Sequence, residues 1–486
     1  MSQLKSHVVR GTRFAVAGRL LRALVGIATL SILSRHLTPQ EFGIMALVAF
    51  VAAFAQILAD FGTRVAIVQR RDVTKLQEDS VFWTNTAIGA AIMVLILVFA
   101  EQISWLLGSD SMAGPLRWVS PIFLMGGLQG VPLSVLERSF AFGRLAVAET
   151  LGAFSGAATA VVLVLAGWDV GALVAQQLVI TFLTGGLYIV FSRWRPGLRY
   201  SRAALKPLVD YGSYVTMTNI VQFFGTQSDR PIIGRRLSPA DLGYISMAEQ
   251  IVLSPLRIVA QMVRKVMFPV MSSIQNDDMR LRRGFLGVQH AQLFVLAPLT
   301  AGLWAIAVPA VELLLGPKWQ MVAVLMGFIT VRATVNTLNS FSAALLAAKG
   351  RARFQFAWSL CSLVLTVITL LAAAPYGVVV LAAARMVQTL AVTPVFLHFT
   401  LRSIGQGYSE FFAVIVRPIL SSVVMAIGVT LLLKVLPFDA VGQLIVAVPF
   451  GAAVYGVMEL SIDRERVLPL LRQTLSRGRK AGQAQF

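Results

Sequence analysis

Apolar runs of about 20 residues recur along the whole chain, and they limit what it can fold into more than any other feature. A run of that length, roughly 20 residues, crosses the hydrocarbon core of a bilayer as one α-helix. The 486 residues are 57% hydrophobic and only 13% charged, and soluble domains carry about twice that charged fraction. The sequence therefore predicts an all-α, polytopic membrane protein.

We expect about fourteen transmembrane helices. Their approximate boundaries are 14–34, 42–62, 81–107, 115–135, 145–167, 170–192, 211–234, 240–263, 285–314, 319–347, 354–374, 376–401, 413–435 and 440–460. The first run contains Arg19 and Arg22 and has no small-residue cleavage site behind it, so we interpret it as an uncleaved span rather than a signal peptide.

The formal net charge of +20 is unevenly distributed. Lys and Arg are concentrated at 193–206, at 264–283 and after residue 463, all in segments that lie on one side if fourteen spans are threaded through a bilayer. By the positive-inside rule that side is the cytoplasm, and both termini then lie there. The charge therefore marks orientation and attraction to anionic lipids, and no nucleic acid partner is needed to explain it.

A short phrase occurs twice, 200 residues apart. "ILSRHLTPQEFG" (32–43) and "IIGRRLSPADLG" (232–243) share five identities and five conservative exchanges. Each copy combines a possible N-cap (Thr38 or Ser238), a proline at the first helical position and an acid placed to complete a capping box. Any tight turn between two spans would look similar, but the same pair of spans follows each copy.

The repeat predicts an internal duplication of six spans. We expect a six-helix bundle over 1–205, a second over 206–405 and two additional spans with a basic cytoplasmic tail over 406–486. Six is even, so both copies have the same orientation, which predicts two bundles related by an axis along the membrane normal with a cavity between them.

Placing a charged side chain within a membrane span costs about 2.5–3.5 kcal/mol of insertion free energy, so each charged residue in the predicted spans requires an explanation. The acids are fewer than the arginines. The arginines are Arg19, Arg22, Arg230, Arg257, Arg332 and Arg385, and the acids are Glu149, Asp229 and Glu249. The surplus predicts a cationic cavity made by Arg19, Arg22, Arg257, Arg332 and Arg385, although Arg19 and Arg257 lie near span ends and can instead reach the headgroups.

Amides lie at helical spacing in two of these spans: Asn219, Gln222, Asn336 and Asn339. They are candidates for lining the polar cavity, although small and polar residues such as these also hold neighbouring spans together. Glu149, Asp229 and Glu249 are candidates either for ion pairs or for binding a coupling ion. The four histidines and the single Cys361 are scattered, so we expect no metal site and no cofactor, and a coupling Na⁺ or H⁺ stays open.

A cationic cavity suits an anionic cargo, and the planar fork of arginine suits phosphate oxygens.

Several stretches of the sequence also resemble a known family of transporters. "SRHLTPQEFGIMALV" (34–48), "LADFGTRVAIVQRRDVT" (58–74), "FWTNTAIG" (82–89) and "LERSFAFGRLAVAE" (136–149) resemble the polysaccharide transporters of the multidrug/oligosaccharidyl-lipid/polysaccharide exporter superfamily. The similarity is greatest to Wzx-type oligosaccharide flippases of the colanic acid and exopolysaccharide exporter branch.

The resemblance implies a flippase that moves undecaprenyl-diphosphate-linked oligosaccharide repeat units across the bacterial inner membrane by alternating access, for exopolysaccharide or lipopolysaccharide biosynthesis. It implies cationic residues in the central cavity, which carries over to Arg19 and Arg22 and less directly to Arg257 and Arg332. A polysaccharide polymerase or export machinery and membrane lipids are the expected partners, and no catalytic motif carries over.

Two other functions remain open. One is multidrug or cation antiport, as in another branch of the same superfamily, although the excess of arginines within spans argues against a cationic cargo. The other is a membrane-embedded polysaccharide polymerase. Such an enzyme needs a long loop or domain outside the membrane to carry its acids or base, and the predicted outside loops are short. We therefore expect a transporter and not an enzyme.

Overall fold

The computed structural model describes residue 18 and residues 21–70, 72–273 and 278–462. Two compact units follow one another along the chain, Met1–Ser246 and Met247–Phe486. Within the described residues all regular structure is helical, in agreement with the predicted all-α class. Arg19 and the basic tail after residue 463 lie outside the described residues.

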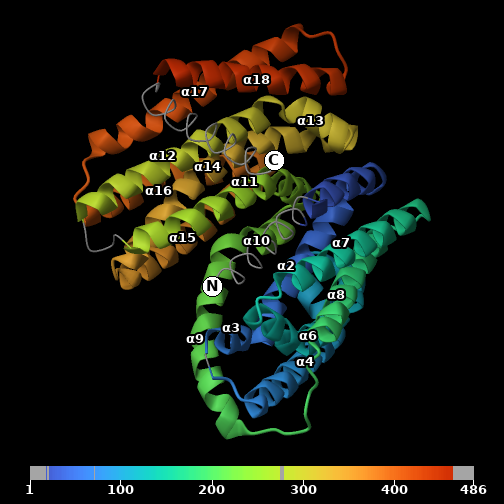
Figure 1. The fold of residues 1–486 in the computed structure, drawn as a ribbon. Helices are drawn as coiled ribbons and strands as arrows, with labels where there is room; N and C mark the ends of the chain where they lie inside the picture. Colours follow the sequence, from blue (N-terminus) through green and yellow to red (C-terminus); the bar gives the residue numbers. More distant parts are fainter. Residues whose placement is uncertain (1–17, 19–20, 71, 274–277, 463–486) are drawn as a thin grey trace, which may run out of the picture. The chain divides into compact units, whose positions relative to one another are not determined.

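The first unit contains a helix over 21–36 and a series of longer and shorter helices (Figure 1). These are α2 (Pro39–Asp60), α3 (Thr63–Gln69), α4 (Lys75–Leu107), α5 (Ala113–Val119), α6 (Pro121–Arg138), α7 (Phe142–Leu165), α8 (Val170–Ser192), α9 (Arg202–Gln227), α10 (Asp229–Arg236) and the start of α11 (Pro239–Ser273). The boundary between the units falls within α11.

The second unit continues with α11 and seven further α-helices. These are α12 (Asp278–Ala305), α13 (Ala307–Leu314), α14 (Gln320–Ala348), α15 (Ala352–Ala373), α16 (Val378–Ile404), α17 (Tyr408–Val435) and α18 (Ala440–Ile462). One of its core clusters joins α12, α14, α16 and α17, with Phe285 stacked between Phe341 and Phe411 at centroid distances of 5.9 and 6.1 Å. The two spans expected beyond the repeat therefore pack directly on this unit through α17.

Eleven described helices or helical segments are long and apolar enough to cross a membrane. They correspond to all the predicted spans except the first, seventh and eighth. The first is only partly described, and the other two fall on α9 with α10 and on α11, where the amides, hydroxyls and charges noted in the sequence lower the hydropathy. The count of fourteen stays a prediction.

Both copies of the repeated phrase begin a helix as predicted. Thr38 caps α2, and the Glu41 side chain accepts a hydrogen bond from the Thr38 backbone N–H in return. In the second copy Asp241 N–H donates to Ser238 Oγ at 3.1 Å, and Asp241 Oδ2 accepts from Ser238 N–H at 3.2 Å. The capping-box expectation is confirmed at both places.

The two turns also pack against each other within the first unit. A Cβ atom on Gly43 would lie 1.6 Å from the Pro239 carbonyl oxygen, and one on Gly243 would lie 1.9 Å from the Pro39 carbonyl oxygen. No side chain larger than hydrogen can occupy either position without moving a backbone. The contact is reciprocal: the same residue of each copy meets the same residue of the other.

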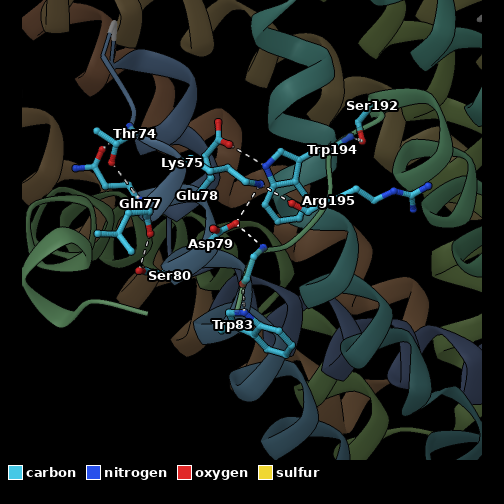
Figure 2. A network of polar contacts seen from close by, with 12 residues as sticks. Thr74, Lys75, Gln77, Glu78, Asp79, Ser80, Trp83, Ser192, Trp194 and Arg195 are labelled. Atoms are coloured by element: carbon cyan, nitrogen blue, oxygen red, sulfur yellow. Dashed lines mark hydrogen bonds and ion pairs between the residues drawn. The ribbon is translucent and has the colours of Figure 1, made fainter. Parts of the chain in front are cut away.

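Figure 2 shows a polar network that attaches the segment 193–201, between α8 and α9, to the start of α4. Trp194 Nε1 donates to Glu78 Oε2 at 2.8 Å, and the Gly197 N–H donates to Asp79 Oδ1 at 2.9 Å. Lys75 Nζ lies 3.1 Å from Asp79 Oδ1 and 3.8 Å from the centroid of the Trp194 ring. Trp83 Nε1 donates to the Gly197 carbonyl. This basic segment is therefore a docked strap and not a free loop.

Candidate functional site

Arg22, in the first helix of the chain, forms an ion pair with Glu149 of α7. Its Nη2 lies 2.9 Å from Glu149 Oε2, and its Nη1 donates to Thr150 Oγ1 at 3.2 Å. The Arg22 side chain is 20% exposed and the Glu149 side chain 43%. Tyr188 of α8 donates to the other carboxylate oxygen at 3.4 Å. The carboxylate is thus held in place but is still open on one side.

Small residues on α7 explain how this pair is positioned. A Cβ on Gly152 would lie 2.0 Å from Thr184 Oγ1, and one on Gly156 would lie 2.4 Å from Ile180 Cγ1. The two glycines therefore let α7 and α8 approach closely, which is the packing role that small residues serve within membranes. The glycines of α7 therefore serve helix packing, while Glu149 on the same helix forms an ion pair.

Arg332 of α14 and Glu249 of α11 form a second ion pair, in the second unit. Arg332 Nη2 donates to Glu249 Oε1 at 2.5 Å, and the side chains are 15% and 17% exposed. Glu149 and Glu249, for which the sequence left ion pairing and coupling open, are therefore both paired with arginines. Each pair is formally neutral, so Arg22 and Arg332 do not contribute to the surplus of cations expected from the sequence.

Arg385 and Asn339 lie in polar contacts on the helices of the second unit. Arg385 Nη1 donates to Thr366 Oγ1 at 2.8 Å and to Gln388 Oε1 at 2.5 Å. Asn339 Nδ2 donates to Thr393 Oγ1 at 2.8 Å, while its Oδ1 is buried without a hydrogen-bond partner among the described residues. These contacts link α14, α15 and α16, as expected for polar groups that hold spans together.

The other predicted site residues are placed more simply. Arg257, Asn219, Gln222 and Asn336 are exposed. Asp229, at the start of α10, is 8% exposed, and no ion pair joins it to Arg230 in the described part of the chain. Arg230 is half-buried, and its Nε lacks a hydrogen-bond partner there.

A cavity of about 590 Å³ lies among α12, α14, α16 and α17 of the second unit. Its walls are mainly apolar and include Trp304, Val331, Leu390 and Ile419, while Thr300 and Thr334 bond to each other at its edge at 2.8 Å. Such a lining favours hydrocarbon over phosphate or sugar. None of the charged or amide residues singled out from the sequence lines this cavity.

Two sets of acidic residues were not predicted from the sequence. Glu78, which is half-buried, and Asp79, which is buried, bind the strap 193–201 from the start of α4, where "TKLQED" reads simply as a capping box. Glu459 lies near the end of the last predicted span, where a glutamate can ordinarily reach the headgroups, yet it is 1% exposed. The sequence did hold one indication of this burial, because Glu459 lies inside the predicted span 440–460.

Comparisons with known proteins agree with the membrane fold. The family described as "Polysaccharide biosynthesis protein" matches residues 32–324. The chain is 28% identical to the succinoglycan biosynthesis transport protein ExoT of Rhizobium meliloti (strain 1021), over 98% of each protein. It is 22% identical to the lipopolysaccharide biosynthesis protein WzxC of Escherichia coli (strain K12), over 73% of this chain and 72% of that protein.

Among solved structures, the fold is similar to that of the lipid II flippase MurJ in an inward closed conformation. The TM-score is 0.77 at 15% identity, and the alignment covers 94% of this chain and all of the other. At that identity the likeness concerns the fold alone.

Proposed function

Because the chain belongs to the polysaccharide biosynthesis protein family, as its resemblance to polysaccharide transporters predicted, we propose that it flips undecaprenyl-diphosphate-linked oligosaccharide repeat units across the inner membrane. The coarser statement, a multi-pass inner-membrane transporter for polysaccharide biosynthesis, rests on the apolar helices and on its relatives. The observation that carries the finer proposal is the end-to-end similarity to a succinoglycan transport protein, over 98% of both chains.

The geometry of Arg22 supports diphosphate recognition by exchange of partners. A guanidinium that already holds Glu149 has its hydrogen-bonding face oriented before the cargo arrives. Phosphate offers the same fork-like geometry as carboxylate with more charge, so it can displace Glu149 from Arg22. Glu149 is 43% exposed and has Tyr188 as a second partner, so it can separate from Arg22 and still keep a hydrogen bond.

Arg332 and Glu249 form a more enclosed pair, which suits a different task. Both side chains are less than a fifth exposed, so displacement of the carboxylate would leave it poorly hydrated. We assign this pair to holding α11 against α14 while Arg22 binds phosphate.

The proposal includes the arrangement predicted from the sequence. The eleven candidate spans become fourteen when the helix over 21–36, α9 with α10, and α11 are counted as crossing the membrane. Two six-helix bundles with two further spans, both termini in the cytoplasm, then expose the site alternately to the two sides. A polysaccharide polymerase would receive the flipped unit, and coupling to Na⁺ or H⁺ would drive it.

The structure argues against a cationic drug as cargo. Such a cargo needs an available carboxylate within the membrane, whereas Glu149 and Glu249 are each bound to an arginine. Asp229 is the remaining acid of the predicted set, and it is buried.

The experiment is flipping of a defined polyprenyl-diphosphate-linked oligosaccharide in vesicles containing the purified protein. Wild type should flip the lipid faster than empty vesicles, and Arg22→Ala should lose most of that activity. Arg117→Ala is the matched control, because Arg117 also lies 2.9 Å from a glutamate, Glu101, but that pair is exposed. Equal rates in wild-type and empty vesicles would reject the function, and equal rates in wild type and Arg22→Ala would reject the site.

A further inference from the structure

The last helix holds a buried carboxyl group that the proposed function does not use. Glu459 lies three residues before the end of α18 and is 1% exposed. Tyr455, one turn earlier on α18, interacts with this carboxyl group, but neither carboxylate oxygen has a partner at full hydrogen-bonding distance within the described residues. An ionised carboxylate in such a place would lose its hydration without replacement, at a cost of several kcal/mol. The position therefore calls for an explanation other than an ordinary surface charge.

The directions of the surrounding helices fix which groups lie at its level. α17 and α12 run parallel, because Phe285 contacts Phe411 near one end while Gly302 faces Met425 further along both helices. α18 follows α17 after the short connection 436–439 and packs against it, as Figure 1 shows. α18 is therefore antiparallel to both α17 and α12.

On the α12 side, the register places His290 at the level of Glu459. Tyr455 of α18 donates its hydroxyl to the Phe294 carbonyl of α12 at 2.9 Å, and their rings lie 5.8 Å apart. One turn onward along α18 is Glu459, and one turn back along α12 is His290, which is 8% exposed. His290 Nδ1 lies 3.3 Å from the Val414 carbonyl of α17, so the imidazole sits between helices.

On the α17 side, the register places Ser421 and Arg417 near the level of Glu459. Gly451 of α18 faces Met425 of α17, and Glu459 lies eight residues, about 12 Å, further on. Eight residues back from Met425 is Arg417, which is half-buried. One turn closer is Ser421, which is fully buried and whose Oγ has no partner among the described residues.

Other charged groups on the elements packed against α18 lie away from this level. Glu312 on α13 and Lys434 on α17 are exposed near the opposite ends of the helices, Glu410 of α17 accepts a hydrogen bond from Gln406, and Arg283 of α12 is exposed. Among the described residues, the register therefore places Tyr455, His290, Ser421 and Arg417 nearest to the level of Glu459.

We propose that Glu459 is a proton-binding site, with its proton held among the helices α12, α17 and α18. The protonated acid is neutral, and its O–H can donate to the hydroxyl oxygen of Tyr455 or Ser421. A metal cation is a poorer occupant, since an arginine and an imidazole lie at the same level, and no group of three or more metal-ligating side chains occurs in the described part of the chain. Acids buried within membranes commonly serve proton transfer.

The site has a built-in consequence for the packing of α18. When the proton leaves, the carboxylate needs donors, and the nearest ones include the Tyr455 hydroxyl, which now bonds to the Phe294 carbonyl. Recruiting that hydroxyl would break the hydrogen bond that ties α18 to α12. Binding and release of one proton therefore changes how the last span is held on the second unit. This inference does not depend on the identity of the transported cargo.

The test is infrared difference spectroscopy on the full-length protein in vesicles of phosphatidylethanolamine and phosphatidylglycerol, between mildly acidic and alkaline buffer. Wild type should show the carbonyl stretch of a buried carboxylic acid, shifted by exchange into D₂O. Glu459→Gln should lose that band completely. Glu459→Asp, which keeps an acid at the position, should move the band rather than remove it. Glu312→Gln removes an exposed carboxyl group and should leave the band unchanged.

Two results would overturn the proposal. One is a wild-type spectrum whose carboxylic-acid region is the same as that of Glu459→Gln, as expected if Glu459 is a permanent carboxylate paired with Arg417. The other is a band that Glu459→Asp leaves at its wild-type frequency, which would assign it to another acid. Because the readout involves no transport, failure of the flipping assay and failure of this proposal are distinguishable.

Discussion

The two arginine–glutamate pairs join the same side chains but in different surroundings. Arg22–Glu149, in the first unit, leaves its carboxylate 43% exposed, whereas both partners of Arg332–Glu249 in the second unit are less than a fifth exposed. A pair with an open carboxylate can exchange that carboxylate for another anion, and an enclosed pair cannot do so without burying a charge. In the proposed mechanism, exposure rather than residue type therefore separates the binding role of Arg22 from the structural role of Arg332.

The largest expected effect is on stability, at the enclosed pair. Arg332→Leu leaves Glu249 without its partner in poorly hydrated surroundings and should reduce the free energy of unfolding by about 3 kcal/mol. Thermal unfolding followed by tryptophan fluorescence measures it. The double variant Arg332→Leu with Glu249→Leu should regain most of the loss. A harmless single substitution would show that this pair is as open as the other one.

The next largest effect is expected on flipping, when the two charges of the open pair Arg22–Glu149 exchange places. Exchanging the partners, Arg22→Glu with Glu149→Arg, keeps an ion pair and should change stability by less than about 1 kcal/mol. Flipping should still fall about 30-fold, because about 2 kcal/mol of charge-assisted bonding to phosphate is lost at the first helix. Full recovery of transport in the swapped protein would contradict the assignment of phosphate binding to Arg22.

A smaller effect tests whether Glu149 competes with the cargo. Glu149→Gln should raise the affinity for inorganic pyrophosphate about fivefold, since roughly 1 kcal/mol of competing attraction is removed. Titration calorimetry on the purified protein measures it, with Glu249→Gln as the comparison that should leave the affinity unchanged. Weaker binding in Glu149→Gln would mean that the glutamate orients the site rather than occupying it.

The smallest effect is expected at the exposed pair Arg117–Glu101, whose atoms are also 2.9 Å apart. Arg117→Ala should change the free energy of unfolding by less than about 0.5 kcal/mol and leave flipping unaltered. Thermal unfolding and the vesicle assay measure both. A loss comparable to that of Arg332→Leu would show that distance, and not exposure, governs these pairs.

The sequence predicted the helices and the helix starts well, because both depend on local signals. Hydropathy located the eleven candidate spans of the described residues, and Thr38–Glu41 and Ser238–Asp241 form their capping boxes as expected. The sequence could not show that Arg22 pairs with Glu149, because helical spacing shows which face of a helix is polar but not which other helix that face meets. Nor could it distinguish Asn339, which bonds to Thr393, from Asn336, which is exposed.

The buried acids show the same limit more clearly. Asp79 is 2% exposed and is bound by the strap 193–201, and Glu459 is 1% exposed on α18, which packs against α17, α13 and α12. Both lie near predicted span ends, where composition alone favours contact with headgroups. Burial there is decided by segments more than 100 residues away or by helix packing, and neither leaves a periodic signal.

The reciprocal contact of Gly43 with Pro239 and of Gly243 with Pro39 has a consequence for the history of the chain. Like meeting like is what a twofold axis produces at the interface of a homodimer. Under the duplication predicted from the sequence, the same contact would have joined two separate polypeptides, each carrying one copy of the phrase. A substitution at either glycine would then disturb the backbone of the other copy, so we expect the two copies to differ less at Gly43 and Gly243 than elsewhere.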